Sequence, residues 1–150
     1  MWTCPKCNAL LVQKNLSHSC GPYTVDDFLK GKSEHGKKLF WYFLREYEKI
    51  GPIILHPVKT RIALMVKVRF SAIGMIGEDY INGHLWLKSR INSRKFYKIE
   101  HLGKDDFIHH FRIRDESDID AEFRRYMRSA YEIGKRKHII SQRKIPDSLN

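Results

Sequence analysis

The chain has 150 residues and a formal net charge of +11, and 42% of its residues are hydrophobic. That composition allows one ordinary core, and no window approaches the roughly 18 consecutive apolar residues that a membrane span requires. The sequence starts without the basic and apolar stretches of a secretory signal, so we expect a cytoplasmic protein. The positive charge favours a polyanionic partner, which is either nucleic acid or an anionic membrane surface.

The first 22 residues carry a metal-ligand pattern. All three cysteines lie before residue 21, and an odd number cannot pair fully within one chain. Cys4 and Cys7 form a Cys-x-x-Cys turn, and His18 and Cys20 follow at finger-like spacing. These four ligands complete a closed tetrahedral site with no position left for water, so they predict one structural zinc ion. A redox dithiol at Cys4 and Cys7, or inert thiols, are the alternatives.

Two helices are expected after this zinc-binding head. Thr24 can cap a short helix that ends at Gly31, and Ser33 can cap a longer one that ends at Gly51. The longer segment places apolar residues three and four positions apart, as an amphipathic helix does. These residues are Leu39, Phe40, Phe43, Leu44, Tyr47 and Ile50.

About five strands are expected next. Residues 53–55 are apolar, and residues 61–70 and 80–88 alternate between apolar and polar side chains. Gly74 and Gly77 indicate a turn between the two alternating segments. Residues 97–102 and 107–114 are typical of a closing hairpin.

A helix from about residue 118 to residue 133 completes the fold, and its acidic residues precede its basic ones as the helix dipole prefers. Residues 135–150 hold five Lys and Arg against one carboxylate and show no periodicity. We therefore expect three parts: a zinc-binding head (1–22), an α+β domain with a mostly antiparallel sheet (23–134) and a mobile basic tail (135–150).

Six stretches of the chain carry a resemblance to a known family: residues 2–7, 17–21, 23–29, 59–62, 83–87 and 109–112. Together they resemble an uncharacterised bacterial family, the domain of unknown function 5655, and more distantly the small YdhG-like α/β proteins. The resemblance implies a zinc-headed α+β domain. It implies no established reaction and supplies no catalytic residues.

The polar faces of the predicted strands combine cations with aromatic and imidazole rings. Cations follow phosphates and aromatic faces stack on bases, which is the physical basis of single-strand binding. The candidate ligand-binding residues are Thr60, Arg61, Lys67, Arg69, His84, Trp86, His110 and Arg112. One alternative is a plain solvated sheet face. Another is that Trp86 packs under one of the helices.

The first hypothesis for function is therefore a zinc-binding module that contacts nucleic acid or another polyanion. The second is a small-anion-binding protein or enzyme with a pocket around His84 and Arg61. A deep pocket with a perturbed imidazole favours the second, and a flat, wet, basic surface favours the first. A third is a protein-interaction adaptor that uses the zinc-binding head, which an exposed apolar patch at Leu10, Leu11 and Val12 would support. Adjacent His109 and His110 point to opposite faces of a strand, so they cannot share one metal site.

Overall fold

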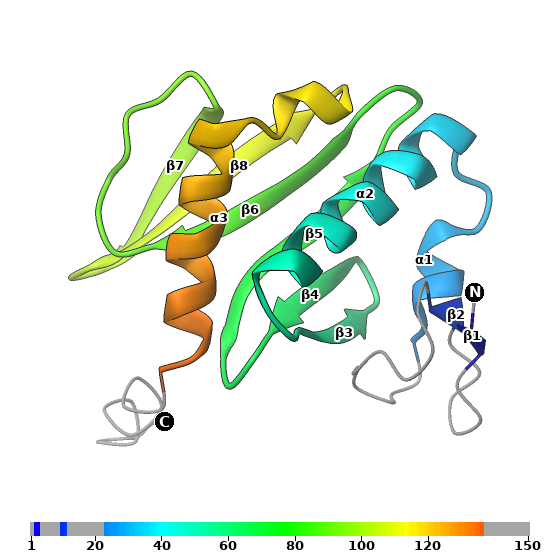
Figure 1. Ribbon diagram of the computed structural model, residues 1–150, viewed down its shortest axis with the longest axis horizontal. Helices are drawn as coiled ribbons and strands as arrows, with labels where there is room; N and C mark the ends of the chain where they lie inside the picture. The colour runs from blue at the N-terminus through cyan, green and yellow to red at the C-terminus, as the bar shows by residue number, and fades with distance from the viewer. Residues whose placement is uncertain (1, 4–9, 12–22, 137–150) are drawn as a thin grey trace.

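Helices cover one face of a six-stranded sheet in the computed structural model, which describes residues 2–3, 10–11 and 23–136 (Figure 1). The helices are α1 (Val25–Leu29), α2 (Glu34–Ile50) and α3 (Ala121–Gly134). The strands are β3 (Ile54–Val58), β4 (Arg61–Met65), β5 (Arg69–Ile76), β6 (Ile81–Leu87), β7 (Phe96–Gly103) and β8 (Asp106–Ile113). Their order is β3-β4-β5-β6-β8-β7, and every neighbouring pair is antiparallel. The predicted α+β class is confirmed.

Side-chain caps fix where the helices begin. The hydroxyl of Thr24 accepts from the backbone N–H of Asp27 at 2.9 Å, and the hydroxyl of Ser33 accepts from Gly36 at 2.9 Å. Such a cap contributes about 0.5–2 kcal/mol. Both predicted helices are confirmed. The last helix begins at Ala121 rather than near residue 118, because Asp120 caps it and a 3-10 turn occupies Glu116–Asp118.

The prediction of one strand over residues 61–70 is wrong, and the sheet gains a strand as a result. The chain reverses at residues 66–68 between β4 and β5. The carbonyl oxygen of Gly134 at the end of α3 accepts from the backbone N–H groups of Lys67 at 2.7 Å and Val68 at 3.1 Å. These two hydrogen bonds from a distant helix stabilise the reversal of the chain, which the alternating pattern of residues 61–70 does not indicate.

The turn expected at Gly74 and Gly77 lies only at the second glycine. β5 continues through Gly74, where its pairing with β6 shifts by a bulge between Ile73 and Met75. The chain then turns after Ile76, and the N–H of Gly77 donates to the carbonyl oxygen of Tyr80 at 2.8 Å.

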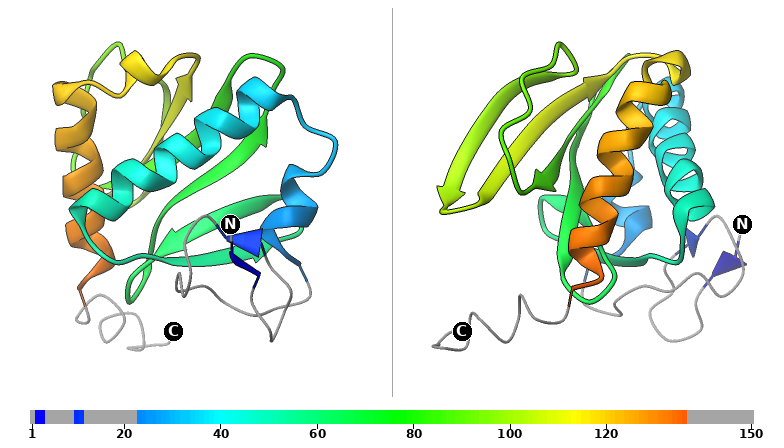
Figure 2. Two further views of the ribbon diagram at one scale, coloured as in Figure 1. Left: turned by 45° about the vertical axis from the view of Figure 1, so that its right-hand side comes forward. Right: turned by 60° about the vertical axis from the view of Figure 1, so that its left-hand side comes forward.

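The core lies between the sheet and the two long helices (Figure 2). Aromatic rings from both layers meet there: Phe111 lies 5.4 Å from Phe43 and 5.1 Å from Phe123, and Tyr47 lies 5.2 Å from Phe70. Each of these five side chains is at most 1% exposed. Because α2 and α3 occupy this face, the opposite face of the sheet is left without a covering helix among the described elements.

A separate two-stranded ladder joins β1 (Trp2–Thr3) and β2 (Leu10–Leu11), with Trp2 opposite Leu11 and Thr3 opposite Leu10. None of the helices within the described ranges is long and apolar enough to cross a membrane.

Candidate functional site

A hollow of about 470 Å³ opens on the sheet face that lies opposite the helices. This size falls within the range of small-molecule sites, which is roughly 300–1,000 Å³. Five strands, β4 to β8, contribute its walls and floor. The lining residues are Arg61, Ala63, Arg69, Ser71, Ala72, Gly74, Asn82, Gly83, His84, Trp86, Tyr97, Glu100, Leu102, Ile108 and His110.

The hollow exists because small residues occupy its floor. The sheet register aligns Ala63 with Ala72, Ala72 with His84, and His84 with His110 in one row across four strands. A Cβ atom added at the neighbouring Gly74 would meet no heavy atom within 4 Å. The alanines and the glycine therefore leave room where larger side chains would fill the face.

His84 lies on this floor with no hydrogen-bond partner for its ring among the described residues. Its side chain is half-buried, and its ring meets that of His110 edge to face at a centroid distance of 5.7 Å. Burial lowers the pKa of His84 to about 4, and the charges of His110 and Arg61 add to this effect. The imidazole is therefore uncharged near neutral pH and can both donate and accept a hydrogen bond.

His110 is held by a carboxylate beside it. Its Nε2 lies 2.6 Å from Oε1 of Glu100, whose side chain is 43% exposed. This hydrogen bond lowers the pKa of Glu100. The hollow thus contains a carboxylate as well as cations.

Two arginines contribute positive charge to the hollow from the starts of β4 and β5. Arg61 and Arg69 are exposed, and neither forms an ion pair with any residue that the structure describes. Lys88, by contrast, is paired: its Nζ lies 2.8 Å from Oδ1 of Asp106, which also accepts from Trp86. The two guanidinium groups are therefore available to a ligand.

Apolar side chains from β6, β7 and β8 form the opposite wall. Trp86 is held at its ring edge, because its Nε1–H donates to Oδ1 of Asp106 at 3.1 Å. Tyr97 and Leu102 on β7 are 57% and 62% exposed. Ile108 lies on β8, between β7 and the strand β6 that carries Trp86. The hollow is therefore cationic at one end and apolar at the other.

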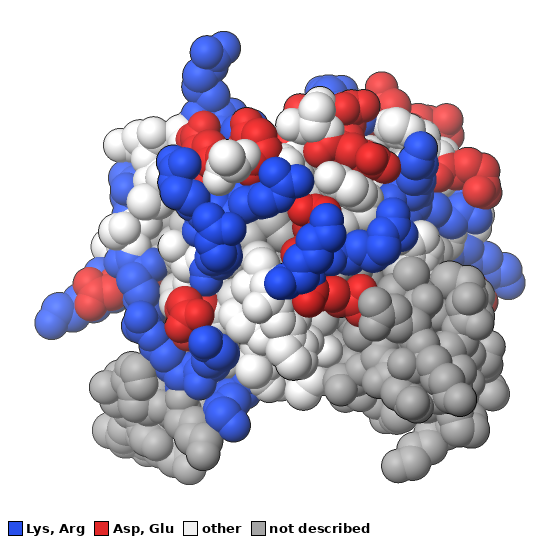
Figure 3. All heavy atoms as spheres, in the orientation of Figure 1, with Lys and Arg blue, Asp and Glu red and all other residues white. Residues whose placement is uncertain are grey.

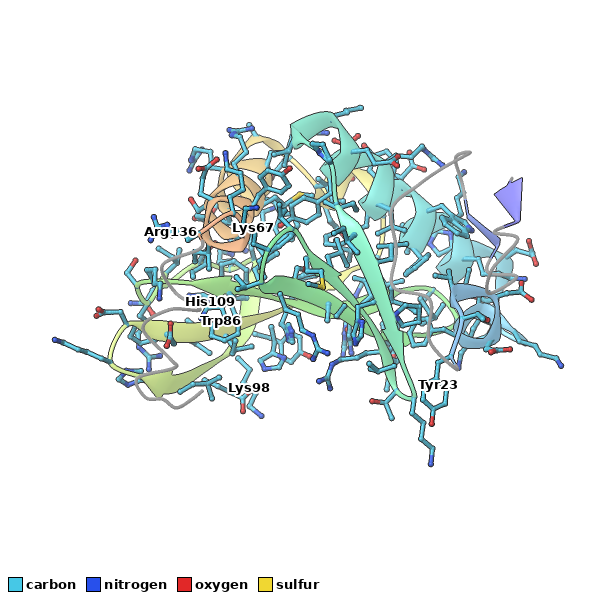
Figure 4. All side chains as sticks on the ribbon, turned by 90° about the horizontal axis from the view of Figure 1, so that it is seen from below. Tyr23, Lys67, Trp86, Lys98, His109 and Arg136 are labelled. Carbon is cyan, nitrogen blue, oxygen red and sulfur yellow. The ribbon has the colours of Figure 1, made fainter. Side chains whose placement is uncertain are left out.

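Five of the eight residues predicted to bind a ligand line the hollow: Arg61, Arg69, His84, Trp86 and His110. The other three do not. Thr60 lies in the turn between β3 and β4, and Lys67 lies in the β4–β5 turn beside the end of α3, near Arg136 (Figure 4). Arg112 is on the open face, but its guanidinium stacks on Tyr80 at 4.6 Å and on Tyr97 at 5.5 Å.

The sequence analysis missed Glu100 and, of the apolar wall, every residue except Trp86. Glu100 pairs with Ile108, and Ile108 pairs with Trp86, so all three share the open face. Strand alternation could have found Ile108, because it is two residues from His110. Glu100 could not be placed, because the β7–β8 register shifts at two bulges.

His109 confirms that the adjacent histidines serve different faces. It is fully buried against the helices, and its Nε2 accepts from the backbone N–H of Ile91 at 2.9 Å. Its Nδ1–H therefore donates to the carbonyl oxygen of Phe107 at 3.3 Å. Burial lowers the pKa of His109, so the ring is neutral and structural.

The predicted zinc ligands Cys4, Cys7, His18 and Cys20 lie outside the described residues, as do residues 137–150 of the predicted tail. Within the described ranges, no group of three or more His, Cys, Asp or Glu residues is placed to hold a metal ion.

Comparison with known proteins gives no functional assignment. No protein-family model, no curated protein and no solved structure matches the chain. The resemblance to the domain of unknown function 5655 stays a prediction.

Proposed function

We propose that the protein binds a small anionic ligand in the hollow on the open face of its sheet. The observation that carries this proposal is a set of polar groups that line one cavity and that no described residue pairs: the imidazole of His84 and the guanidinium groups of Arg61 and Arg69. Because the ring of His84 has no hydrogen-bond partner among the described residues, a ligand can bond to it without breaking an internal hydrogen bond.

The binding chemistry follows from these groups. A guanidinium offers paired N–H donors that match the two oxygens of a phosphate or carboxylate. The neutral imidazole of His84 donates a further hydrogen bond to the anion, and the partial burial of this ring strengthens that bond. The apolar wall around Trp86 then excludes water from one side of the ligand.

A pocket explains the geometry better than a flat polyanion surface does. The Glu100 carboxylate inside the hollow repels a passing phosphate backbone, and Lys67 does not share the face with Arg61 and Arg69. On the helix-bearing face, acidic and basic side chains are interspersed (Figure 3).

The test is a titration of the full chain with phenyl phosphate, followed by backbone amide NMR shifts. We expect shifts at Ala72, Gly74 and His84, and at least about tenfold weaker binding after the double substitution Arg61→Gln/Arg69→Gln. The matched control, Arg45→Gln/Arg128→Gln, removes two exposed arginines of the helices and should leave the affinity unchanged. Equal losses in both double variants would contradict the proposal.

An uncharged variant separates cavity binding from surface charge. Gly74→Leu places a side chain in open space at the hollow, where an added Cβ would meet nothing. We expect it to abolish phenyl phosphate binding while the net charge stays constant. Unchanged binding would show that the ligand lies elsewhere.

Nucleic-acid binding is the second candidate, and the net charge of +11 favours it. Its test is fluorescence anisotropy with a single-stranded oligonucleotide across a salt series, on the full chain. A log affinity that falls with log salt by about 0.7 per phosphate contact would support it. Absence of binding at moderate salt would reject it.

We also propose that Cys4, Cys7, His18 and Cys20 hold one structural zinc ion. Three thiolates and an imidazole are the donor set of closed zinc sites, and the β1–β2 ladder pairs the segments that flank Cys4 and Cys7 in the sequence. Elemental analysis of the purified full chain should give one zinc per chain and none after Cys7→Ser. Zinc retained at one equivalent in Cys7→Ser would contradict this ligand set.

A further inference from the structure

We propose that the ligand of the hollow is a nucleotide unit: an anionic group joined to a planar heteroaromatic ring that carries N–H donors. This inference rests on the proposed function and names the ligand class for the same site. It derives from the length of the hollow, the carboxylate at its far end and the apolar wall beside that carboxylate.

The length of the hollow indicates an elongated ligand. Arg61 lies on β4 and Glu100 lies on β7, and the sheet order places four strand spacings between them. At the usual spacing this is roughly 19 Å between backbones, part of which the two long side chains fill. A bare phosphate or carboxylate at the arginines would leave the far end of the 470 Å³ hollow empty.

The carboxylate at the far end selects for hydrogen-bond donors. One oxygen of Glu100 is bonded to His110, and no described residue bonds the other. An ionised carboxylate only accepts hydrogen bonds, so it repels a second anionic group and pairs with ring or exocyclic N–H groups. A nucleobase offers such groups at its edge, whereas a plain aryl ring offers none.

The apolar wall fits a flat ring. The ring edge of Trp86 is fixed by Asp106, and Tyr97 and Leu102 are exposed beside it. Nucleobases stack on aromatic side chains because every base has a π-face. In Figure 4, Trp86 and Lys98 are labelled on strands of this part of the sheet, which lies away from α1. Together the groups place an anion-binding end and a ring-binding end in one cavity.

The experiment is isothermal titration calorimetry of the full chain with inorganic phosphate, phenyl phosphate, guanosine 5′-monophosphate and a single-stranded tetranucleotide. We expect the nucleotide to bind at least about tenfold more tightly than phenyl phosphate. Glu100→Gln should remove most of this preference, because the amide no longer favours N–H donors and no longer repels the anion. Arg61→Gln should weaken the binding of the nucleotide and of phenyl phosphate by a similar factor. Gly74→Leu should abolish the binding of both.

The outcomes separate this inference from the proposed function. If phenyl phosphate binds as tightly as the nucleotide, and Glu100→Gln leaves their ratio unchanged, the nucleotide inference is wrong and the anion site stands. If no phosphate compound binds, both are wrong. Tetranucleotide binding that depends on Glu100 and is blocked in Gly74→Leu identifies a nucleotide within a strand as the source. Tighter binding of the free nucleotide than of the tetranucleotide, with the same dependence on Glu100, identifies the monomer instead.

Discussion

The two faces of the sheet use the same residue type for opposite purposes, as His84 and His109 show. His109 faces the helices, is fully buried and has a backbone partner at each ring nitrogen. His84 lies on the other face of the sheet, where the β6–β8 register pairs it with His110; its ring has no partner among the described residues and lines an open hollow. A histidine with satisfied nitrogens stabilises a fold, whereas one held half-buried without partners is available to a ligand.

The same contrast holds for packing. The helix-bearing face carries large buried side chains such as Phe70 and Phe111, whereas small residues (Ala63, Ala72 and Gly74) leave room around His84 on the open face. Substitutions on the first face should therefore change stability, and substitutions on the second should change binding. Four predictions test this division, from the largest expected effect to the smallest.

Phe111→Ala should give the largest loss of stability. Phe111 is fully buried between Phe43 on α2 and Phe123 on α3, so its removal leaves a cavity between the layers. We expect a loss of about 3–5 kcal/mol in the free energy of unfolding, measured by urea denaturation. Tyr97→Ala on the open face is the control and should cost under about 1 kcal/mol, because Tyr97 is 57% exposed. Similar losses in both variants would contradict the division.

The second prediction concerns the pH dependence of stability. His84 has a folded-state pKa of about 4 against 6.5 for an unperturbed imidazole, so the unfolded chain takes up a proton first as the pH falls. Stability therefore decreases from about pH 6.5 down to about pH 4, by roughly 2–3 kcal/mol from this group. Between these two pH values, the free energy of unfolding of His84→Leu should therefore fall by roughly 2–3 kcal/mol less than that of the wild type. Parallel pH profiles for the two proteins would refute the assignment of a depressed pKa.

A matched pair of substitutions gives the third effect. His109→Leu leaves the backbone N–H of Ile91 without its acceptor and should cost about 1–3 kcal/mol at neutral pH. His84→Leu breaks no hydrogen bond of the imidazole ring among the described residues, so its cost should be near zero. Thermal unfolding of both variants at one neutral pH measures the difference. The account fails here if His84→Leu is the more damaging change.

The smallest stability effect is expected for Arg61→Gln/Arg69→Gln. Neither arginine is paired with a described residue, and exposed charges contribute little to stability. We expect a change of at most about 0.5 kcal/mol in the free energy of unfolding, which can be measured in the same urea series. A large loss would assign these arginines a structural role instead of a binding role.

The elements that the sequence predicts correctly are those with local signals. Thr24 and Ser33 are caps with short hydroxyl side chains, and the strict alternation through Asn82, His84 and Trp86 places these three side chains on one face. Each of these features depends on residues within a few positions of one another.

The features that the sequence does not predict depend on distant partners. The reversal at residues 66–68 is held by the carbonyl oxygen of Gly134, so the local pattern reads as one strand and places Lys67 on the wrong face. The position of Glu100 beside His110 depends on bulges in the β7–β8 pair. The hollow itself arises from Ala63 and Ala72, whose small size carries no functional signal in a sequence.

The most direct test of the central claim is a histidine-selective NMR titration of the full chain, with and without saturating phenyl phosphate. In the free protein the pKa of His84 should be about 4. An anion bound beside the ring favours its charged form, so the account predicts that the ligand raises the pKa of His84 and leaves the signal of His109 unmoved. If the pKa of His84 is the same with and without the ligand, the hollow is not the anion site.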